Sequence, residues 1–394
     1  MKTSKALLKS LSLIRITITG GILLFTVIAM VSCQKNGVMG GNEVFNPNGF
    51  NMDKFEQNIR NTYGPNTVGF SYAIAAGENI VRHGAMGKAL TGTDGNVNYT
   101  SETRQEIFSV TKFMTTIAAA RLLQQRGKTM DEPIWAYIPP SWTKHASYNT
   151  LTFRQMLSHN SGFPMEDRGY DSLKLMLTKP QGNKAYNYNN ANFALCRILL
   201  PFLKYNGGMM NQIAPGELEE VCAEEFRKIM REQVLQPAGL AFWEKIDFKD
   251  WNHLNQNPFP YTRYYLLSDM SVGSVENTDD VLIAGSRGLV LSAYEVVQVM
   301  IAFEKGLLVP ASTRQMMKEQ GCGFDGVGGL SGAKGKYFWK NGGGTYSRGQ
   351  GGETIIMIFP NSIMVSVHGN SNFNPNDQWV GSPSKIAKAY DDAW

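Results

Sequence analysis

The alternation of apolar and polar residues predicts β-strands near both ends of the chain. The predicted strands are 67–76, 79–86, 354–359 and 363–368. Turns at Gly77-Glu78 and at Pro360-Asn361-Ser362 join them in pairs, so each end of the domain contributes one hairpin.

Helical spacing of apolar residues dominates the part of the chain between these hairpins. The predicted helices are 51–63, 108–125, 152–157, 192–203, 217–235, 293–305 and 384–394. No internal repeat and no regular strand–helix alternation is present, which argues against a doubly wound parallel sheet. We therefore expect an α+β fold, in which both chain ends build one antiparallel sheet flanked by helices and a mostly helical subdomain is inserted.

The first 33 residues have the charge and hydropathy of an export signal. Basic residues precede the apolar run 16–31, and Ser32-Cys33 follows it. A small residue and then cysteine resembles a bacterial lipoprotein processing site, although Met30 stands where Leu is usual. We expect lipidation of Cys33, with ordinary secretion and an uncleaved anchor as alternatives. The mature protein would then be lipid-anchored to a bacterial membrane, facing the periplasm or the cell surface, through a tether at 34–50 that leads to a domain at 51–394.

Composition narrows the functional classes. The chain has 394 residues, 18% of them charged, and a net charge of only +5 without a basic run, so nucleic-acid binding is not expected. The five histidines are scattered and neither Cys-x-x-Cys nor His-Glu-x-x-His occurs, so no metal or cofactor is expected. At most one disulfide can form among Cys196, Cys222 and Cys322, and free buried thiols are the default. We expect a monomer.

Chemistry is concentrated first at Ser109-Val-Thr-Lys112. Ser-x-x-Lys occurs five times, starting at Ser32, Ser109, Ser141, Ser331 and Ser382. Only Ser109 opens a helix with an apolar face, where a serine hydroxyl and a lysine one turn apart can meet. A buried neutral lysine can activate serine, and free N–H groups at the helix start can stabilise an oxyanion. The alternative is a capping serine followed by a surface lysine.

Two further segments carry polar groups suited to acyl transfer. Tyr188-Asn189-Asn190 is the single Tyr-x-Asn of the chain, and its phenol could shuttle a proton while Asn190 binds the substrate and the lysine. Glycines in 347–353 precede a predicted strand and would let a ligand approach its backbone closely. The alternatives are an Asn-rich helix-capping turn and a flexible glycine-rich hairpin arm, the latter supported by the nearby Gly342-Gly343-Gly344.

In combination, these motifs resemble the serine β-lactamase and penicillin-binding-protein superfamily, closest to its class C β-lactamase-related branch. The matching stretches, in order, are Ile107-Phe-Ser-Val-Thr-Lys112, 127–139, Thr152-Phe-Arg-Gln-Met-Leu-Ser-His-Asn-Ser-Gly-Phe-Pro164, Tyr186-Asn-Tyr-Asn-Asn190, Gln236-Pro-Ala-Gly-Leu240 and Gly285-Ser-Arg-Gly-Leu289. The resemblance implies a β-lactamase/transpeptidase-like fold over 51–394. It also implies Ser109 as nucleophile, Lys112 and Tyr188 as general base and acid, and Asn190 as a substrate-binding residue.

The third motif of the family, Lys or His followed by x-Gly, is matched best by Ser347-Arg348-Gly349, which lacks the lysine. The resemblance then makes Ser347, Arg348, Gly349 and Gln350 substrate-binding, with the Gln350 N–H as the second oxyanion donor and Arg348 as an anion partner. Without the lysine, β-lactam hydrolysis is in doubt.

The expected function is hydrolysis of a small-molecule or peptide ester or amide through a Ser109 acyl-enzyme. Alternatives are a β-lactamase or D,D-carboxypeptidase, and, in a different class, a catalytically silent sensor or scaffold. His159 is either a structural loop residue, as in the family, or the base of a Ser-His-Asp triad. The segments 165–182 and 247–275 are rich in aromatics, which either line the substrate pocket or pack these loops onto the domain.

Overall fold

Strands from both chain ends pair into one sheet, as the sequence predicts. The computed structural model describes residues 49–248, 261–274, 280–346, 349–372 and 382–394. Within these residues β1 (Gly69–Ala76) pairs antiparallel with β2 (Asn79–Leu90) and with β11 (Ile363–Gly369). The sheet continues from β11 to β10 (Gly351–Ile358) and then β9 (Gly335–Thr345). Its remaining strands are β3 (Val97–Asn98), β5 (Tyr264–Leu266), β6 (Asp269–Ser274), β8 (Asp325–Gly332) and β12 (Ser371–Asn372).

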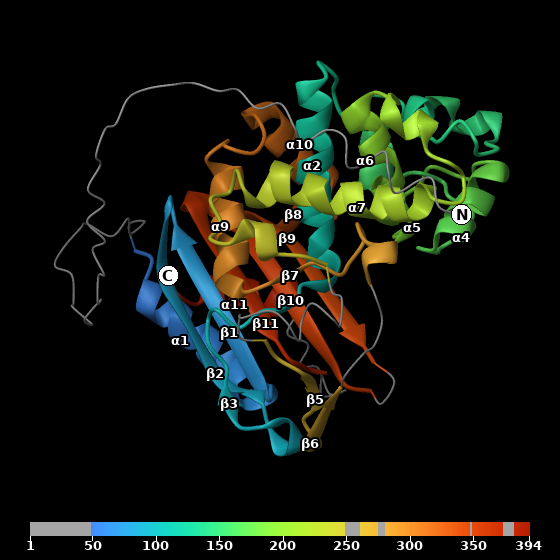
Figure 1. Ribbon diagram of the computed structural model, residues 1–394. Coiled ribbons are helices and arrows are strands. Elements are labelled where there is room, and N and C mark those ends of the chain that lie inside the picture. Colours follow the sequence, from blue (N-terminus) through green and yellow to red (C-terminus); the bar gives the residue numbers. More distant parts are fainter. Residues whose placement is uncertain (1–48, 249–260, 275–279, 347–348, 373–381) are drawn as a thin grey trace, which may run out of the picture. The chain divides into compact units, whose positions relative to one another are not determined.

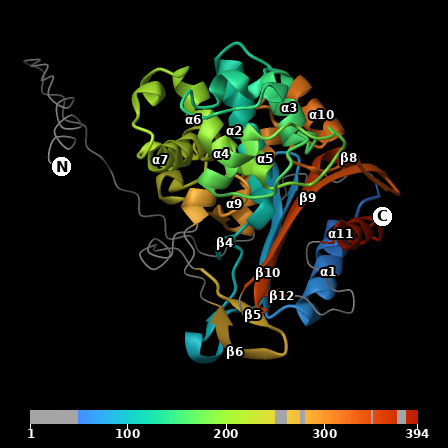
Figure 2. The same ribbon diagram turned by 90° about the vertical axis from the view of Figure 1, so that its right-hand side faces the viewer.

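Helices cover both faces of the sheet, which is why β1 is buried along its whole length. Alternate residues of a strand point to opposite faces. Tyr72 and Ile74 pack with α1 (Met52–Tyr63) and α11 (Pro383–Asp391), whereas Ala73 and Ala75 belong to the core that includes α2 and α9. Figure 2 shows α1 and α11 on one side of the sheet and α2 and α9 on the other.

The inserted helical part contains most of the predicted helices. Between β2 and β8 the structure describes the helices α2 (Thr111–Gln125), α3 (Phe153–Leu157), α4 (Tyr170–Thr178), α5 (Ala191–Ala194), α6 (Cys196–Tyr205), α7 (Leu218–Met230), α9 (Ala293–Glu304) and α10 (Ala311–Gln320). Thr152 and Ser292 form capping boxes at the starts of α3 and α9. Figure 1 shows α4, α5, α6 and α7 close together in the upper part of the view. In the described part of the chain, no helix is both long and apolar enough to cross a membrane.

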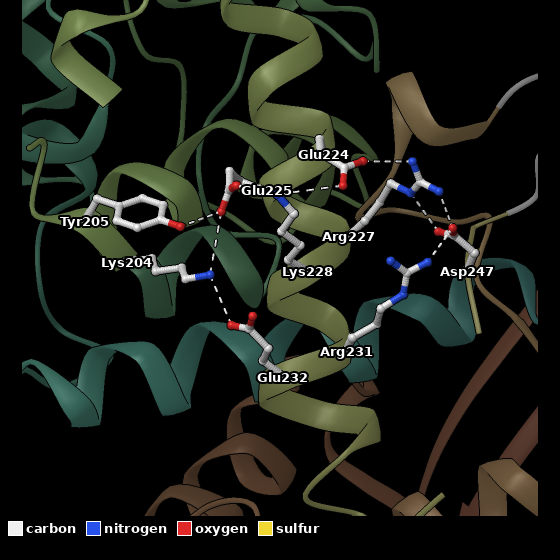
Figure 3. Close-up of polar contacts among 9 residues, drawn as sticks. All are labelled: Lys204, Tyr205, Glu224, Glu225, Arg227, Lys228, Arg231, Glu232 and Asp247. Atoms are coloured by element: carbon white, nitrogen blue, oxygen red, sulfur yellow. Dashed lines mark hydrogen bonds and ion pairs between the residues drawn. The ribbon is translucent and has the colours of Figure 1, made fainter. Parts of the chain in front are cut away.

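A network of ion pairs links α6, α7 and the segment after α7 (Figure 3). Lys204 lies 3.0 Å from Glu232 and 3.6 Å from Glu225, which also accepts a 2.6 Å hydrogen bond from Tyr205. Asp247 pairs with Arg227 and, at 2.5 Å, with Arg231. The Asp247 side chain is only 8% exposed, so it depends on these two guanidinium groups in place of water.

Several parts of the structure differ from what the sequence predicts. The glycine-rich segment that includes 342–344 is part of strand β9 and not a flexible arm, because it pairs with β10 over eight residues. Helix α4 occupies the middle of 165–182, which was expected to be a loop. Phe50, assigned to the tether, is buried against Tyr390 and Trp394. The three cysteines Cys196, Cys222 and Cys322 are free and buried.

Candidate active site

Ser109 lies in a short turn at the entrance of α2. The predicted helix 108–125 divides into a 3₁₀ turn, Phe108–Val110, and the α-helix that follows it. Phe108 has a φ of +47°, a left-handed conformation that is rare for a bulky residue and marks local strain. Its ring is held by Tyr264 and Tyr346, at centroid distances of 5.7 and 6.5 Å.

Lys112 reaches Ser109 from the first turn of α2. Its Nζ lies 2.9 Å from Ser109 Oγ, 2.8 Å from Asn190 Oδ1 and 2.7 Å from the Ser286 carbonyl oxygen. The lysine is completely buried. The pKa of Lys112 is held well below its usual value, first because burial disfavours the ammonium and second because Lys340 is close.

A neutral Lys112 fits these three contacts in one way. An uncharged amine has two N–H donors and one lone pair. Asn190 and Ser286 offer only carbonyl oxygens, so they take the two N–H groups. The lone pair is then directed at Ser109, from which it can accept the hydroxyl proton. The geometry therefore provides a base for the serine.

Tyr188 supplies the second polar contact of the serine. Its hydroxyl donates to Ser109 Oγ at 2.9 Å, and its ring lies 5.1 Å from Lys112 Nζ. Asn190, two residues on, contacts the lysine through Oδ1, while its Nδ2 donates to Glu166 at 2.6 Å. The structure thus brings together Ser109, Lys112, Tyr188 and Asn190, the four residues of the first two predicted motifs.

His159 supports this arrangement without touching the serine. Its ring stacks on Tyr188 at 4.5 Å, and its Nδ1 accepts a hydrogen bond from the Asn189 N–H at 3.1 Å. Burial, with Lys112 and Lys340 nearby, lowers the pKa of His159 to about 3, so the imidazole is neutral at ordinary pH. The described hydrogen bonds of Ser109 Oγ go to Lys112 and Tyr188, which favours the structural role for His159 over the triad role.

Strand β9 passes directly beside the serine. A Cβ placed on Gly342 would lie 2.5 Å from the Ser109 nitrogen and 2.9 Å from the Ile107 carbonyl oxygen. Only glycine permits so close an approach of the two backbones. Strand β9 therefore borders Ser109 at Lys340-Asn341-Gly342, a Lys-x-Gly pattern that fits the third motif of the family better than Ser347-Arg348-Gly349 does.

Lys340 is the site residue that sequence reasoning missed. Its side chain is 2% exposed, and its Nζ donates to Asp325 Oδ2 at 2.6 Å and to the Asn341 carbonyl oxygen at 2.7 Å. The same Nζ lies 5.6 Å from the centre of the Tyr188 ring. A buried ion pair thus borders the catalytic candidates.

The predicted third motif lies further along the hairpin. Ser347 and Arg348 are outside the described residues, as are Cys33, most of the tether and residues 249–260. The Gly349 N–H donates to the Tyr346 carbonyl oxygen at 2.9 Å, within the turn between β9 and β10. Gln350 extends its Nε2 to the Val272 carbonyl oxygen, on β6. The contact with the Ser109 backbone comes instead from Gly342, eight residues before Gln350.

The described aromatics of the two loops pack onto the domain. Tyr170 stacks edge-on against Trp142 and accepts a hydrogen bond from it, and Phe248 packs against Phe226. Tyr265 is fully buried. These contacts match the packing interpretation and not the pocket-lining one for these residues.

A family model matches the part of the chain that contains the catalytic candidates. Residues 55–201 match the family model described as Beta-lactamase, and this segment contains Ser109, Lys112, Tyr188 and Asn190. A comparison with curated protein sequences found no match.

Solved structures share the fold at low sequence identity. An octameric penicillin-binding protein homologue from Pyrococcus abyssi has a TM-score of 0.57 and 16% identity, over 86% of this chain and 74% of that one. The penicillin-binding protein from Bacillus halodurans gives 0.58 and 15%, over 86% and 99%. FmtA from Staphylococcus aureus gives 0.60 and 14%, over 90% and 92%. The chain therefore has the β-lactamase/transpeptidase-like fold, and its residues 55–201 are similar to the Beta-lactamase family.

Proposed function

We propose that this protein is a serine hydrolase that cleaves an ester or amide bond through an acyl-enzyme on Ser109. One observation carries the proposal: a buried lysine with a lowered pKa and a tyrosine hydroxyl both lie 2.9 Å from the serine oxygen. A serine needs such a base before it can attack a carbonyl. The lysine is desolvated and hydrogen-bonded, so the site is preorganised to take up a proton at neutral pH.

The steps follow from the contacts. Lys112 accepts the Ser109 proton as Oγ attacks the substrate carbonyl carbon. Tyr188, also in contact with Oγ, passes a proton to the leaving oxygen or nitrogen, and the C–O or C–N bond breaks. Water then attacks the acyl-serine ester and gives a proton to the Tyr188 oxygen that lost its own. Lys112 returns its proton to Ser109 Oγ as the ester C–O bond breaks, and the acid is released. Because Lys112 and Tyr188 share the serine, they titrate as one coupled pair.

The oxyanion requires two N–H donors, and β9 offers the second. The Asn341 N–H donates to Asp325 Oδ2 at 3.2 Å, and its carbonyl oxygen accepts from Lys340, so both backbone groups point away from β10. Alternation along a strand gives Gly343 the same direction. We assign the Ser109 and Gly343 N–H groups as the oxyanion donors, in place of Gln350.

Covalent labelling tests the proposal directly. A fluorophosphonate probe should label the wild-type protein, and the wild-type protein should hydrolyse p-nitrophenyl esters. Ser109→Ala should abolish both the labelling and the hydrolysis. Ser141→Ala is a matched control, because it removes the serine of another Ser-x-x-Lys in the same chain. Equal labelling of Ser109→Ala and wild type would contradict the proposal. Labelling without any turnover would favour the silent sensor or scaffold.

A second candidate is hydrolysis of a β-lactam or of a D-Ala-D-Ala peptide. The position of Lys340 beside Tyr188 favours it, whereas the pairing of Lys340 with Asp325 disfavours binding of the carboxylate that such substrates carry. Nitrocefin turnover at rates above those for p-nitrophenyl esters would favour this candidate and the class C branch.

For the N-terminal segment, we keep the lipoprotein proposal on the sequence pattern alone. Metabolic labelling with a fatty-acid analogue in a bacterial host should mark the wild-type chain and spare Cys33→Ser. Equal labelling of both chains would contradict lipidation at Cys33.

A further inference from the structure

Resting on the proposed function, we infer that Asp325 is a specificity-determining residue: by neutralising Lys340 it fits the site to uncharged acyl substrates and excludes carboxylate-bearing ones. The inference rests on the surroundings of Lys340. This buried lysine lies beside Tyr188, and its charge is already matched by the carboxylate of Asp325.

The Lys340–Asp325 pair is built and not incidental. Asp325, at the start of β8, stands opposite Trp339 in the register of β8 with β9. Its Oδ2 accepts from Lys340 Nζ at 2.6 Å and from the Asn341 N–H at 3.2 Å. Two of the three Lys340 protons are thus committed to Asp325 and to the Asn341 carbonyl oxygen. A bound carboxylate would have to compete with both partners.

The other charges around the nucleophile are balanced as well. Burial lowers the pKa of Lys112 well below its usual value, which favours the uncharged amine. Arg287 forms a two-pronged pair with Glu106, at 2.7 and 2.9 Å, and lies 3.6 Å from Asp280. On the loop before α4, Glu166 accepts a hydrogen bond from Asn190, and Arg168 follows two residues later. Among the described groups nearest Lys112, the positive charges do not exceed the negative ones.

This balance has a consequence for the substrate. An unpaired ammonium near the serine would attract a substrate carboxylate. An ammonium paired with Asp325 attracts that carboxylate only weakly, and the negative charge of Asp325 repels it. Selection against anionic substrates is therefore a property of one side chain on β8. Asp325→Asn keeps the size of the side chain and an oxygen for the Lys340 hydrogen bond, but it removes the opposing charge.

The experiment compares two esters that differ in one charge: the mono-p-nitrophenyl ester of adipic acid and its methyl ester. Wild type should prefer the uncharged diester. In Asp325→Asn, kcat/KM for the anionic ester relative to the neutral one should rise about tenfold, and 0.5 M NaCl should reduce that gain. Both rates come from one sample, so the ratio does not depend on the folded fraction.

Two control variants separate charge from structure. Asp325→Glu keeps the negative charge and should keep the wild-type preference. Asp325→Asn combined with Lys340→Met removes both charges and should return the ratio towards that of wild type. A wild-type preference for the anionic ester, or an unchanged ratio in Asp325→Asn, would overturn the inference. Absence of Ser109-dependent turnover of both esters would instead refute the proposed function.

Discussion

The contact between Gly342 and the Ser109 backbone gives the sharpest prediction for the site. In Gly342→Ala the new methyl group would lie 2.5 Å from the Ser109 nitrogen, whereas ordinary contact begins at 3.4 Å. It would also lie 2.9 Å from the Ile107 carbonyl oxygen and from Phe108 Cβ, so it meets atoms of three consecutive residues. Relief requires the serine turn and β9 to separate by about 0.9 Å.

A displacement of this size should disable the site more than the fold. Misplacing a catalytic group by about 1 Å lowers the rate roughly 10²-fold, which corresponds to about 2.7 kcal/mol of transition-state stabilisation. Overpacking should also lower the free energy of unfolding, by about 1–3 kcal/mol. We therefore expect kcat/KM for a p-nitrophenyl ester to fall about 100-fold in a variant that remains folded at 25 °C.

The assay measures kcat/KM beside circular dichroism and thermal unfolding. Gly216→Ala is a matched control, since no atom lies within 4 Å of the Cβ it would gain, and it should leave kcat/KM unchanged. Wild-type kcat/KM in Gly342→Ala, with a normal unfolding transition, would refute the placement of β9 against the nucleophile.

Three further predictions test other parts of the structure. Tyr188→Phe removes the hydroxyl that contacts Ser109 Oγ and should lower kcat about 10²–10⁴-fold, measured by steady-state kinetics; an unchanged kcat would exclude Tyr188 as the proton donor. Lys112 must be neutral to act, so kcat/KM should fall as the pH drops through the lowered pKa of Lys112. Because the pKa of His159 is about 3, His159→Asn should leave this acid limb of the pH profile in place. A shift of the limb by one pH unit or more in that variant would implicate the histidine. Asp247→Ala strands two arginines and should lower the free energy of unfolding by about 2 kcal/mol in urea titrations while kcat is retained; unchanged stability would mean that the network of Figure 3 contributes little.

The elements that could be predicted are those whose local sequence agrees with their tertiary role. Helix α1 starts after Asn51, whose side chain caps it, and its apolar residues repeat at helical spacing. The outer hairpins have strand-forming residues and clear turns. Strands β8 and β9 are different, because glycines occupy positions where strands usually carry branched or aromatic residues. Strand β9 is held by pairing with β10 and strand β8 by pairing with β9, and Gly342 of β9 leaves the space that the serine turn requires.

The candidate site divides in the same way. The candidates Ser109, Lys112, Tyr188 and Asn190 could be picked out from the sequence alone, since a lysine one turn after a serine and a single Tyr-x-Asn are local patterns whose chemistry can be reasoned about directly. Tertiary structure decided the state of Lys112, because burial and the neighbouring Lys340 lower its pKa. The fold also places Lys340-Asn341-Gly342 beside Ser109. It brings Asp325, from another strand, next to Lys340, where the carboxylate matches the charge of the lysine. Proximity across strands and exclusion of water are properties of the folded chain, so no local pattern encodes them.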